Sequence, residues 1–411
     1  MLLRYILKQG LCLVAGILLI ASCGNKKKEE KKTTVHPTAT IPIDQNLRNR
    51  LVEFASKPRV KGKFAVYVYD LTAHRPVYGF HENVSIPSAS CLKLLTGISG
   101  LHLLGTHYKY ATSIYTRGSV KDGVLDGDIA FKGDLDPQLN APDLSMFAKA
   151  LKRKGIRKMT GHFYIDLLLQ EPVKSEQHWY PWDLSFSRYG ILYKGAPKVE
   201  KELKSALRNQ GIAIADSQIV IGRVPKGSHC IFRFYRGIEK VIKRMLKNSS
   251  NTQATSLLYT IGHRANPHQH PTVAGVGYLR HFLRNDLGQR DTSLVIHDGC
   301  GLCTYNHLSP KALTEALIYG YQHKPIYSVL YRNLSISGVD GTLRSELSDP
   351  KLRGKIRGKT GTLSHPYGIS SLTGYCRGSN GHMLAFSIMD SEMSVLDARV
   401  LQRDLCKALI K

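Results

Sequence analysis

Three short motifs carry the residue types needed for serine-based cleavage of an acyl bond. The first is Ser90-Cys91-Leu92-Lys93, in which the serine and the lysine are three residues apart. On a helix this spacing brings the Lys93 amine next to the Ser90 hydroxyl. A serine hydroxyl is a poor nucleophile until a base removes its proton, and a lysine can act as that base only when it is neutral. Ser90 is therefore the predicted nucleophile and Lys93 the predicted general base.

The motif Lys359-Thr360-Gly361-Thr362 supplies groups that would tune this pair and hold a ligand. Burial and a second nearby cation both lower the pKa of a lysine, and Lys359 is the predicted second cation. Lys359 and the hydroxyls of Thr360 and Thr362 offer donors to an anionic group of the ligand. Gly361 has no side chain, so a substrate backbone is expected to approach the strand closely there.

The motif Ser249-Ser250-Asn251 comes just before a predicted helix. Its Ser249 hydroxyl and Asn251 amide can hydrogen-bond both a lysine and a substrate amide. A purely structural interpretation exists for each motif, with Ser90, Ser249 and Asn251 as helix caps and Lys359 as a charge on an edge strand. The order of the three motifs and the elements that carry them favour the catalytic interpretation.

Two further patterns are weaker. Ser348-Asp349-Pro350-Lys351 also fits S-x-x-K, but Pro350 is incompatible with a helix interior and no apolar helix follows. Cys300 and Cys303 form a C-x-x-C near His297 and His307, yet a lone C-x-x-C without a second pair is a weak sign of a zinc or redox site. We therefore predict no metal at these residues.

The elements around the motifs predict an α/β fold of the α+β kind, in which one domain is interrupted by a mainly β insertion. Alternating apolar residues predict strands, and apolar residues spaced three and four apart predict helices. In the first domain, residues 41–105 and 236–411, we expect strands at 63–71, 77–80, 355–363, 369–376 and 383–388, and helices at 91–105, 238–246, 252–261, 273–285, 310–321 and 393–410. In the insertion, residues 106–235, we expect strands at 110–116, 124–131, 161–167 and 218–224, and a helix at 143–154.

Composition excludes a disordered chain and points to anionic partners. Of 411 residues, 42% are hydrophobic, and 58 Lys and Arg against 31 Asp and Glu give a formal charge of +27. This excess favours nucleic acid, membrane head groups or polymers that carry carboxylates. The basic residues are dispersed and no nucleic-acid-binding motif accompanies them, so a nucleic-acid role is not expected.

The N-terminal residues predict export. Arg4 and Lys8 precede an uncharged apolar stretch, residues 11–21, which has the pattern of a secretory signal and is too short for a membrane span. Residues 20–24, Ile-Ala-Ser-Cys-Gly, resemble a bacterial lipobox, in which the cysteine becomes the lipidated first residue of the mature protein. We therefore predict a lipoprotein signal peptide at 1–22, lipidation of Cys23, and a flexible tether at 23–40. The alternative is ordinary cleavage beside an incidental cysteine.

The motifs belong to longer blocks that resemble a known family. Residues 86–96, 127–134, 245–251, 297–299, 338–343 and 358–363 look like successive blocks of the D-alanyl-D-alanine carboxypeptidase/endopeptidase family. These are low-molecular-weight penicillin-binding proteins with a large insertion after the S-x-x-K helix. Ser90 and Ser249 are 159 residues apart, a distance that suits such an insertion.

The resemblance implies a fold, an activity and a set of roles. The fold would be a β-lactamase/transpeptidase-like domain with an antiparallel sheet flanked by helices, plus the inserted domain. Ser90 would be acylated by peptidoglycan stem peptides or β-lactams, Lys93 would be its base, and Ser249 would relay protons. Asn251 would hold the substrate amide, while Lys359, Thr360, Gly361 and Thr362 would form the strand that binds the substrate and its terminal carboxylate. No organic cofactor would take part. The protein would act at the cell envelope, on the periplasmic side, anchored to a membrane by lipid.

Three positions depart from the family pattern. Ser250 stands where Asp is common, and Cys300 and Cys303 replace serines. Two alternatives to the peptidase stay open. One is a β-lactamase or esterase of the same fold, and the other is a catalytically inactive scaffold lipoprotein of the cell envelope.

Overall fold

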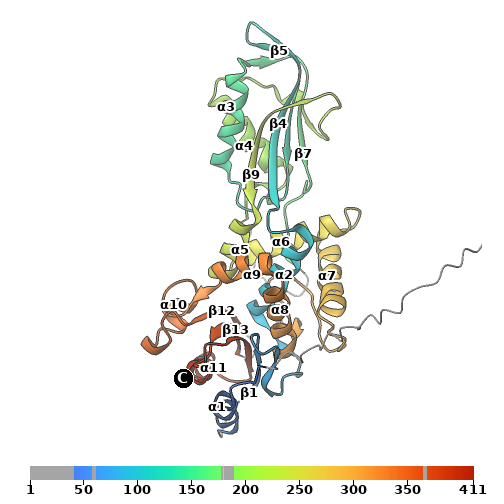
Figure 1. Cartoon of the computed structure of the whole chain (residues 1–411). Helices are drawn as coiled ribbons and strands as arrows, with labels where there is room; N and C mark the ends of the chain where they lie inside the picture. Colours follow the sequence, from blue (N-terminus) through green and yellow to red (C-terminus); the bar gives the residue numbers. More distant parts are fainter. Residues whose placement is uncertain (1–40, 58–61, 177–178, 180–188, 364–367) are drawn as a thin grey trace, which may run out of the picture. The chain divides into compact units, whose positions relative to one another are not determined.

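The motif Lys359-Thr360-Gly361-Thr362 lies on a six-stranded antiparallel sheet built from both ends of the chain (Figure 1). The strand order is β11 (Ser335–Ile336), β12 (Ile356–Leu363), β13 (Ile369–Arg377), β14 (Met383–Ser391), β1 (Lys63–Asp70) and β2 (Arg75–Phe80). This computed structural model describes residues 41–57, 62–176, 179, 189–363 and 368–411. The predicted signal peptide, Cys23 and the tether lie outside the described residues.

Helices cover both faces of this sheet. One face packs against α8 (Pro310–Gln322) and through it α2 (Leu92–Leu104), α5 (Ile238–Lys247), α6 (Asn251–Ala265), α7 (Pro271–His281) and α9 (Lys324–Asn333). The other face packs against α1 (Gln45–Ser56) and α11 (Val395–Ile410). Side chains of β14 alternate accordingly, with Ala385 and Met389 in the first core and Phe386 and Ile388 in the second.

A second sheet is formed entirely within residues 109–237. Its strand order is β8 (Ile219–Ile221), β7 (Phe163–Leu167), β5 (Val124–Gly133), β4 (Lys109–Lys121) and β9 (His229–Gly237), with β6 (Lys158–Met159) beside β5. Two helices, α3 (Ser145–Arg153) and α4 (Ala196–Arg208), lie together on one side of this sheet (Figure 1). The remaining short elements are β3 (Ile86–Pro87), which pairs with β10 (His307–Leu308), and α10 (Leu343–Glu346).

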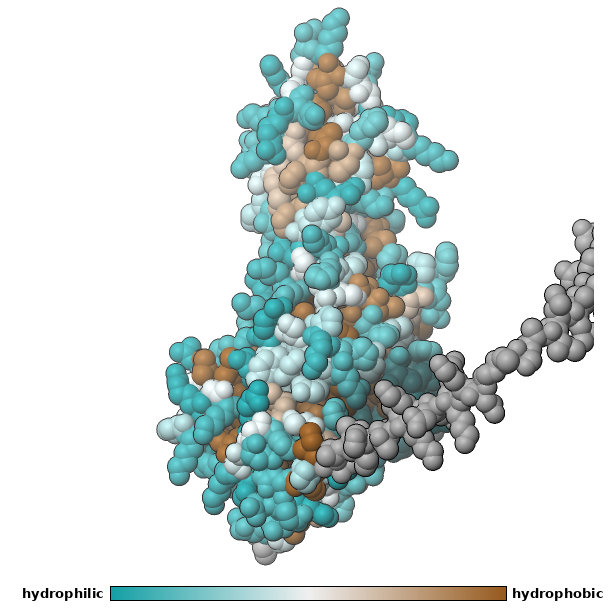
Figure 2. Space-filling model, in the orientation of Figure 1, coloured by the Kyte–Doolittle hydropathy of each residue, from teal (hydrophilic) through white to brown (hydrophobic). Residues whose placement is uncertain are grey.

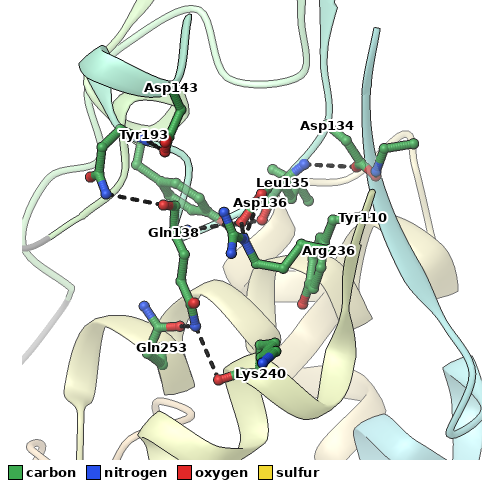
Figure 3. A network of polar contacts seen from close by, with 12 residues as sticks. Tyr110, Asp134, Leu135, Asp136, Gln138, Asp143, Tyr193, Arg236, Lys240 and Gln253 are labelled. Carbon is green, nitrogen blue, oxygen red and sulfur yellow. Dashed lines mark hydrogen bonds and ion pairs between the residues drawn. The ribbon is translucent and has the colours of Figure 1, made fainter. Parts of the chain in front are cut away.

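A buried polar network joins the second sheet to the helices α5 and α6 (Figure 3). Arg236 at the end of β9 donates from Nε to both oxygens of Asp136, at 2.7 and 2.8 Å. Gln138 donates from its side-chain amide to Gln253 Oε1 of α6 and to the Lys240 carbonyl of α5. One hydrophobic core also runs through both sheets, and residues 41–411 form one compact unit. The division into an interrupted domain and an insertion at 106–235 therefore stays our proposal.

The predicted fold class is confirmed, and so are most of the predicted elements. The sequence interpretation missed α1, α4, α9 and β9. The helix expected at 273–285 is α7, which begins two residues earlier, at Pro271, and is followed by one π-helical turn at Phe282–Asp286. Along the described ranges, no helix is long and apolar enough to cross a membrane. The face of the molecule in Figure 2 is mostly hydrophilic, with small separate apolar patches, as the charge of +27 leads one to expect.

Candidate active site

Ser90 and Lys93 meet at the start of α2, as their spacing predicts. A single 3-10 turn, Ala89–Cys91, leads into the helix. Nζ of Lys93 lies 2.7 Å from Oγ of Ser90. Lys93 is completely buried, whereas Ser90 is partly exposed. The hydroxyl therefore faces outward with its amine partner behind it, in the protein interior.

Two oxygen atoms from distant parts of the chain complete the surroundings of Lys93. Its Nζ donates to Oδ1 of Asn251 at 2.7 Å and to the carbonyl of Cys300 at 2.6 Å. Burial lowers the pKa of Lys93, because removing the ammonium from water disfavours its charge. A neutral amine has two N–H donors and one lone pair. The two acceptors can take both N–H groups, which leaves the lone pair for the Ser90 hydroxyl.

Lys359 is a second completely buried lysine, on β12. Its Nζ donates to Ser249 Oγ at 2.8 Å and to the carbonyl of Thr360. Burial, with a smaller contribution from repulsion by Lys93, lowers the pKa of Lys359 to about 7. The sequence predicted that Lys359 would lower the pKa of Lys93. In the structure burial is the main cause that lowers the pKa of Lys93, and the repulsion between the two amines disfavours the state in which both are protonated.

The motif at residues 249–251 places each of its side chains differently. Ser249 has φ +54°, a backbone conformation that is rare for a residue with a side chain and that often occurs at functional sites. Ser250 is the N-cap of α6, since its Oγ accepts a hydrogen bond from the Gln253 N–H at 3.4 Å. The structural interpretation assigned the cap to Ser249 or Asn251. Because Ser250 caps the helix instead, Ser249 and Asn251 are available to the two lysines.

The structure shows a packing reason for a glycine at position 361, which the sequence interpretation did not predict. A Cβ there would lie 2.3 Å from Ser371 Oγ and 2.9 Å from the Ser88 carbonyl, so the glycine lets β12 pack against the segment before Ser90. This close approach is to the protein itself, and the approach of a substrate backbone at Gly361 stays a prediction. Thr360 donates its hydroxyl to Thr342 Oγ1 at 2.9 Å, and Thr362 is partly exposed on the same strand.

Asp298 organises the loop that presents the Cys300 carbonyl to Lys93, a role that the sequence interpretation missed. The Asp298 side chain is 1% exposed. It accepts hydrogen bonds from the backbone N–H groups of Cys300, Gly301 and Cys303, from Asn306 Nδ2 and from Trp179 Nε1, at distances of 2.6 to 3.0 Å. The available signal was Asp298-Gly299-Cys300-Gly301, because Asp beside glycines often folds a loop around its own carboxylate.

The C-x-x-C pattern belongs to the same loop. Cys300 and Cys303 are buried, and burial raises the pKa of both thiols, which disfavours the thiolate that a metal needs. Within the part of the chain that the structure describes, no three His, Cys, Asp or Glu side chains lie close enough to hold a metal ion. The six cysteines of the described residues are free thiols.

The second S-x-x-K match has no such surroundings. Ser348 and Lys351 are exposed, and Pro350 starts a short 3-10 turn between them and not an α-helix. Only the match at Ser90 has the buried lysine that the proposed chemistry needs.

Comparisons with known proteins agree with this geometry. The chain matches the D-Ala-D-Ala carboxypeptidase 3 (S13) family over residues 47–189 and 192–409. D-alanyl-D-alanine carboxypeptidase DacB of Haemophilus influenzae is 20% identical over 407 residues, which cover 77% of this chain and 83% of that protein.

Solved structures share the fold at low sequence identity. Penicillin binding protein 4 (dacB) of Haemophilus influenzae gives a TM-score of 0.74 at 17% identity, covering 88% of this chain and 99% of that chain. The predatory peptidoglycan endopeptidase Bd3459 of Bdellovibrio bacteriovorus gives 0.56 at 16% identity, covering 85% and 92%. The family predicted from the motifs is confirmed, and with it the enzyme class, a serine-type D-Ala-D-Ala carboxypeptidase. With the family match covering nearly all of residues 47–409, the chain belongs to the D-Ala-D-Ala carboxypeptidase 3 (S13) family.

Proposed function

We propose that this chain cleaves D-alanyl-D-alanine ends and cross-bridges of peptidoglycan stem peptides through an acyl-enzyme on Ser90. The observation that carries the proposal is the position of Lys93, whose Nζ is completely buried and lies 2.7 Å from Ser90 Oγ. A buried amine with a lowered pKa is the base that a serine nucleophile needs.

In the acylation step, the neutral amine of Lys93 takes the Ser90 proton while Oγ attacks the carbonyl carbon of the penultimate residue. Asn251 Oδ1 and the Cys300 carbonyl hold the amine in place, and both stabilise the ammonium that forms. Ser249 then relays a proton to the leaving amine: its Oγ accepts from Lys359, its own proton goes to the amine nitrogen, and the proton that Lys93 took replaces it, so that Lys93 is neutral again. The peptide bond breaks, the terminal amino acid leaves, and water later hydrolyses the ester.

The terminal carboxylate of the substrate is expected to bind beside β12. Lys359 is completely buried, so it would attract the carboxylate electrostatically and orient Ser249, while the partly exposed Thr362 would make direct contact. The expectation that Lys359 engages the carboxylate stays a prediction, and we propose that it does so through its charge.

Backbone N–H groups of Ser90 and Thr362 are the proposed oxyanion donors. On β12, the N–H and C=O of Ile356 bond to Ser337 on the β11 side. Because backbone groups alternate sides along a strand, the N–H of Thr362 points to that same edge. No strand among the described residues pairs with this edge beyond Gly358, so an extended substrate can align there.

We also propose that the protein acts at the cell envelope, held by a lipid anchor on the periplasmic side of a membrane. The support is the lipobox-like sequence before Cys23 and the polar residues that follow it. Metabolic labelling with a fatty-acid probe tests the anchor. We expect Cys23→Ala to abolish the label and to move the protein out of the membrane fraction, and a label that persists would contradict lipidation at Cys23.

Covalent labelling with a fluorescent penicillin tests the nucleophile. We expect the wild-type protein to be labelled and Ser90→Ala to lose the label completely. Ser348→Ala is the matched control, because it removes the serine of the other S-x-x-K and should leave labelling unchanged. A label that persists on Ser90→Ala would refute this nucleophile.

The fate of the label separates the alternatives. Slow release, together with D-alanine liberated from a soluble stem pentapeptide, supports the peptidase. Rapid release supports a β-lactamase or esterase. An absence of labelling on well-folded protein supports the inactive scaffold.

A further inference from the structure

Among the described residues, helices cover one face of the second sheet and no helix packs on the other, which we call the open face. Phe131 of β5 and Phe232 of β9 both contact Phe147 of α3 in edge-to-face geometry, so helices cover this side. Neighbouring residues along a strand point to opposite sides. Arg233 and Tyr235 therefore lie on the other side, where Arg233 is exposed and Tyr235 is 51% exposed.

Arg233 is held in one orientation on this open face by neutral groups. Its Nε donates to Ser113 Oγ at 2.9 Å, and its two terminal nitrogens donate to the hydroxyls of Tyr235 and Tyr115, each at 3.3 Å. A guanidinium has five N–H donors, so two remain, one on each terminal nitrogen. An arginine can bind a carboxylate through two such donors.

The charge of Arg233 is not balanced by a neighbouring acid. Two other cations of the same face have carboxylate partners, since Arg117 pairs with Asp128 and Lys132 lies 3.8 Å from Asp166. Among the residues that the structure describes, no carboxylate forms an ion pair with Arg233. Lys109 adds a further positive charge, with its Nζ 5.7 Å from the centre of the Tyr235 ring. The site thus combines an oriented, unneutralised cation with two tyrosines, which offer apolar rings and polar hydroxyls to a ligand.

We propose that this Arg233–Tyr235–Tyr115 site of the open sheet face binds a carboxylate of the peptidoglycan polymer, away from the bond that is cleaved. The proposal rests on the proposed function, because a polymer that carries carboxylates is the substrate there. Binding at the second sheet would hold the chain on insoluble peptidoglycan while Ser90 acts on stem peptides. Short soluble peptides, in contrast, would be cleaved without using this site.

Cosedimentation of the full-length, detergent-solubilised chain with purified peptidoglycan sacculi tests the proposal. We expect Arg233→Gln to weaken binding about tenfold, the loss of one charged bidentate contact. Arg117→Gln is the matched control, because it removes the same charge from the same face at a site already neutralised by Asp128, and it should weaken binding less than about twofold. Tyr235→Ala should also weaken binding, and penicillin labelling of each variant reports whether it is folded.

Other arms identify the ligand and separate this site from the active site. Amidation of the carboxylates of the sacculi should weaken binding of the wild-type protein to the level of Arg233→Gln. Arg233→Gln and wild type should cleave a soluble stem pentapeptide at the same rate. If the wild type does not cleave this peptide, the result counts against the proposed function and not against the Arg233 site. Equal binding of Arg233→Gln and wild type to sacculi would overturn the proposal. So would wild-type binding that survives amidation, or that is matched by vesicles of anionic phospholipid.

Discussion

Replacing Lys359 by methionine should change how stability depends on pH, because a buried lysine resists protonation. In the folded protein the pKa of Lys359 is lowered to about 7 from its ordinary 10.5. Between these values the unfolded chain binds one more proton than the folded protein. The free energy of unfolding of the wild type should therefore rise with pH in this window, by at most about 1.4 kcal/mol per pH unit from this group.

The size of the effect follows from the two pKa values. From about pH 7.5 to about pH 9.5, the Lys359 contribution to the free energy of unfolding should rise by about 2.5 kcal/mol. Above about pH 10.5 both states lose the proton and the contribution ends. Buried thiols act in the opposite direction, since burial raises the pKa of Cys376 to about 12 and stability from that group falls as pH rises above its ordinary 9.0. Both proteins contain the same thiols, so the thiol contribution cancels when the free energies of unfolding of wild type and Lys359→Met are subtracted.

Urea unfolding of both proteins at several pH values measures that difference. We expect the wild-type curve to rise relative to the Lys359→Met curve, while Lys63→Met, an exposed lysine on the same sheet, gives a curve parallel to wild type. Lys93→Met should behave like Lys359→Met, because burial lowers the pKa of Lys93 as well. If wild type and Lys359→Met stay parallel within about 0.5 kcal/mol from about pH 7.5 to 9.5, the pKa of Lys359 is not lowered. If wild type and Lys93→Met also stay parallel, the pKa of Lys93 is not lowered and the proposed base fails.

Three further changes test the site. Penicillin acylation by the wild type should slow as pH falls through the lowered pKa of Lys93, and a flat rate profile from about pH 5 to about 9 would contradict a lysine base. Asp298→Asn should lower the free energy of unfolding by about 3 kcal/mol or more and slow acylation at least about tenfold. The reason is that the new NH2 group must face at least two N–H donors that now bind a carboxylate oxygen. Unchanged urea unfolding and labelling rates would refute this role of Asp298. Gly301→Ala should strongly reduce labelling, since its Cβ would lie 1.9 Å from the Ala89 carbonyl at φ +82°, whereas Gly277→Ala, with nothing within 4 Å, should label like wild type.

The sequence predicted the parts of the site that depend on spacing within one element. Ser90 and Lys93 meet because three residues on a helix bring side chains together, and Lys359 lies on β12, within the strand predicted at 355–363. The helix α1 was missed although a signal existed, since Leu47, Leu51, Phe54 and Ala55 follow helical spacing after an Asp44 cap.

Other parts could not be derived from local patterns. The Cys300 carbonyl contacts Lys93 across 207 positions of sequence, and a backbone carbonyl has no residue type to recognise. Its position depends on how the carboxylate of Asp298 folds a loop. Likewise, β9 was missed because it exposes alternate residues such as Arg233 and Tyr235. These polar positions made the apolar residues between them, which face α3, hard to recognise as one side of a strand.

The two buried lysines need opposite protonation states, and a bound substrate can favour one state for each. Lys93 must be neutral to take a proton, whereas Lys359 must be charged to attract a carboxylate. Repulsion between them opposes the state in which both are protonated, and burial opposes every charge at the site. A substrate carboxylate beside β12 favours the charged form of Lys359, and that charge in turn disfavours protonation of Lys93. We infer that a ligand with a free terminal carboxylate favours the neutral form of Lys93, the base that the reaction needs. This is a physical reason for such a pair of lysines to act on D-alanyl-D-alanine ends.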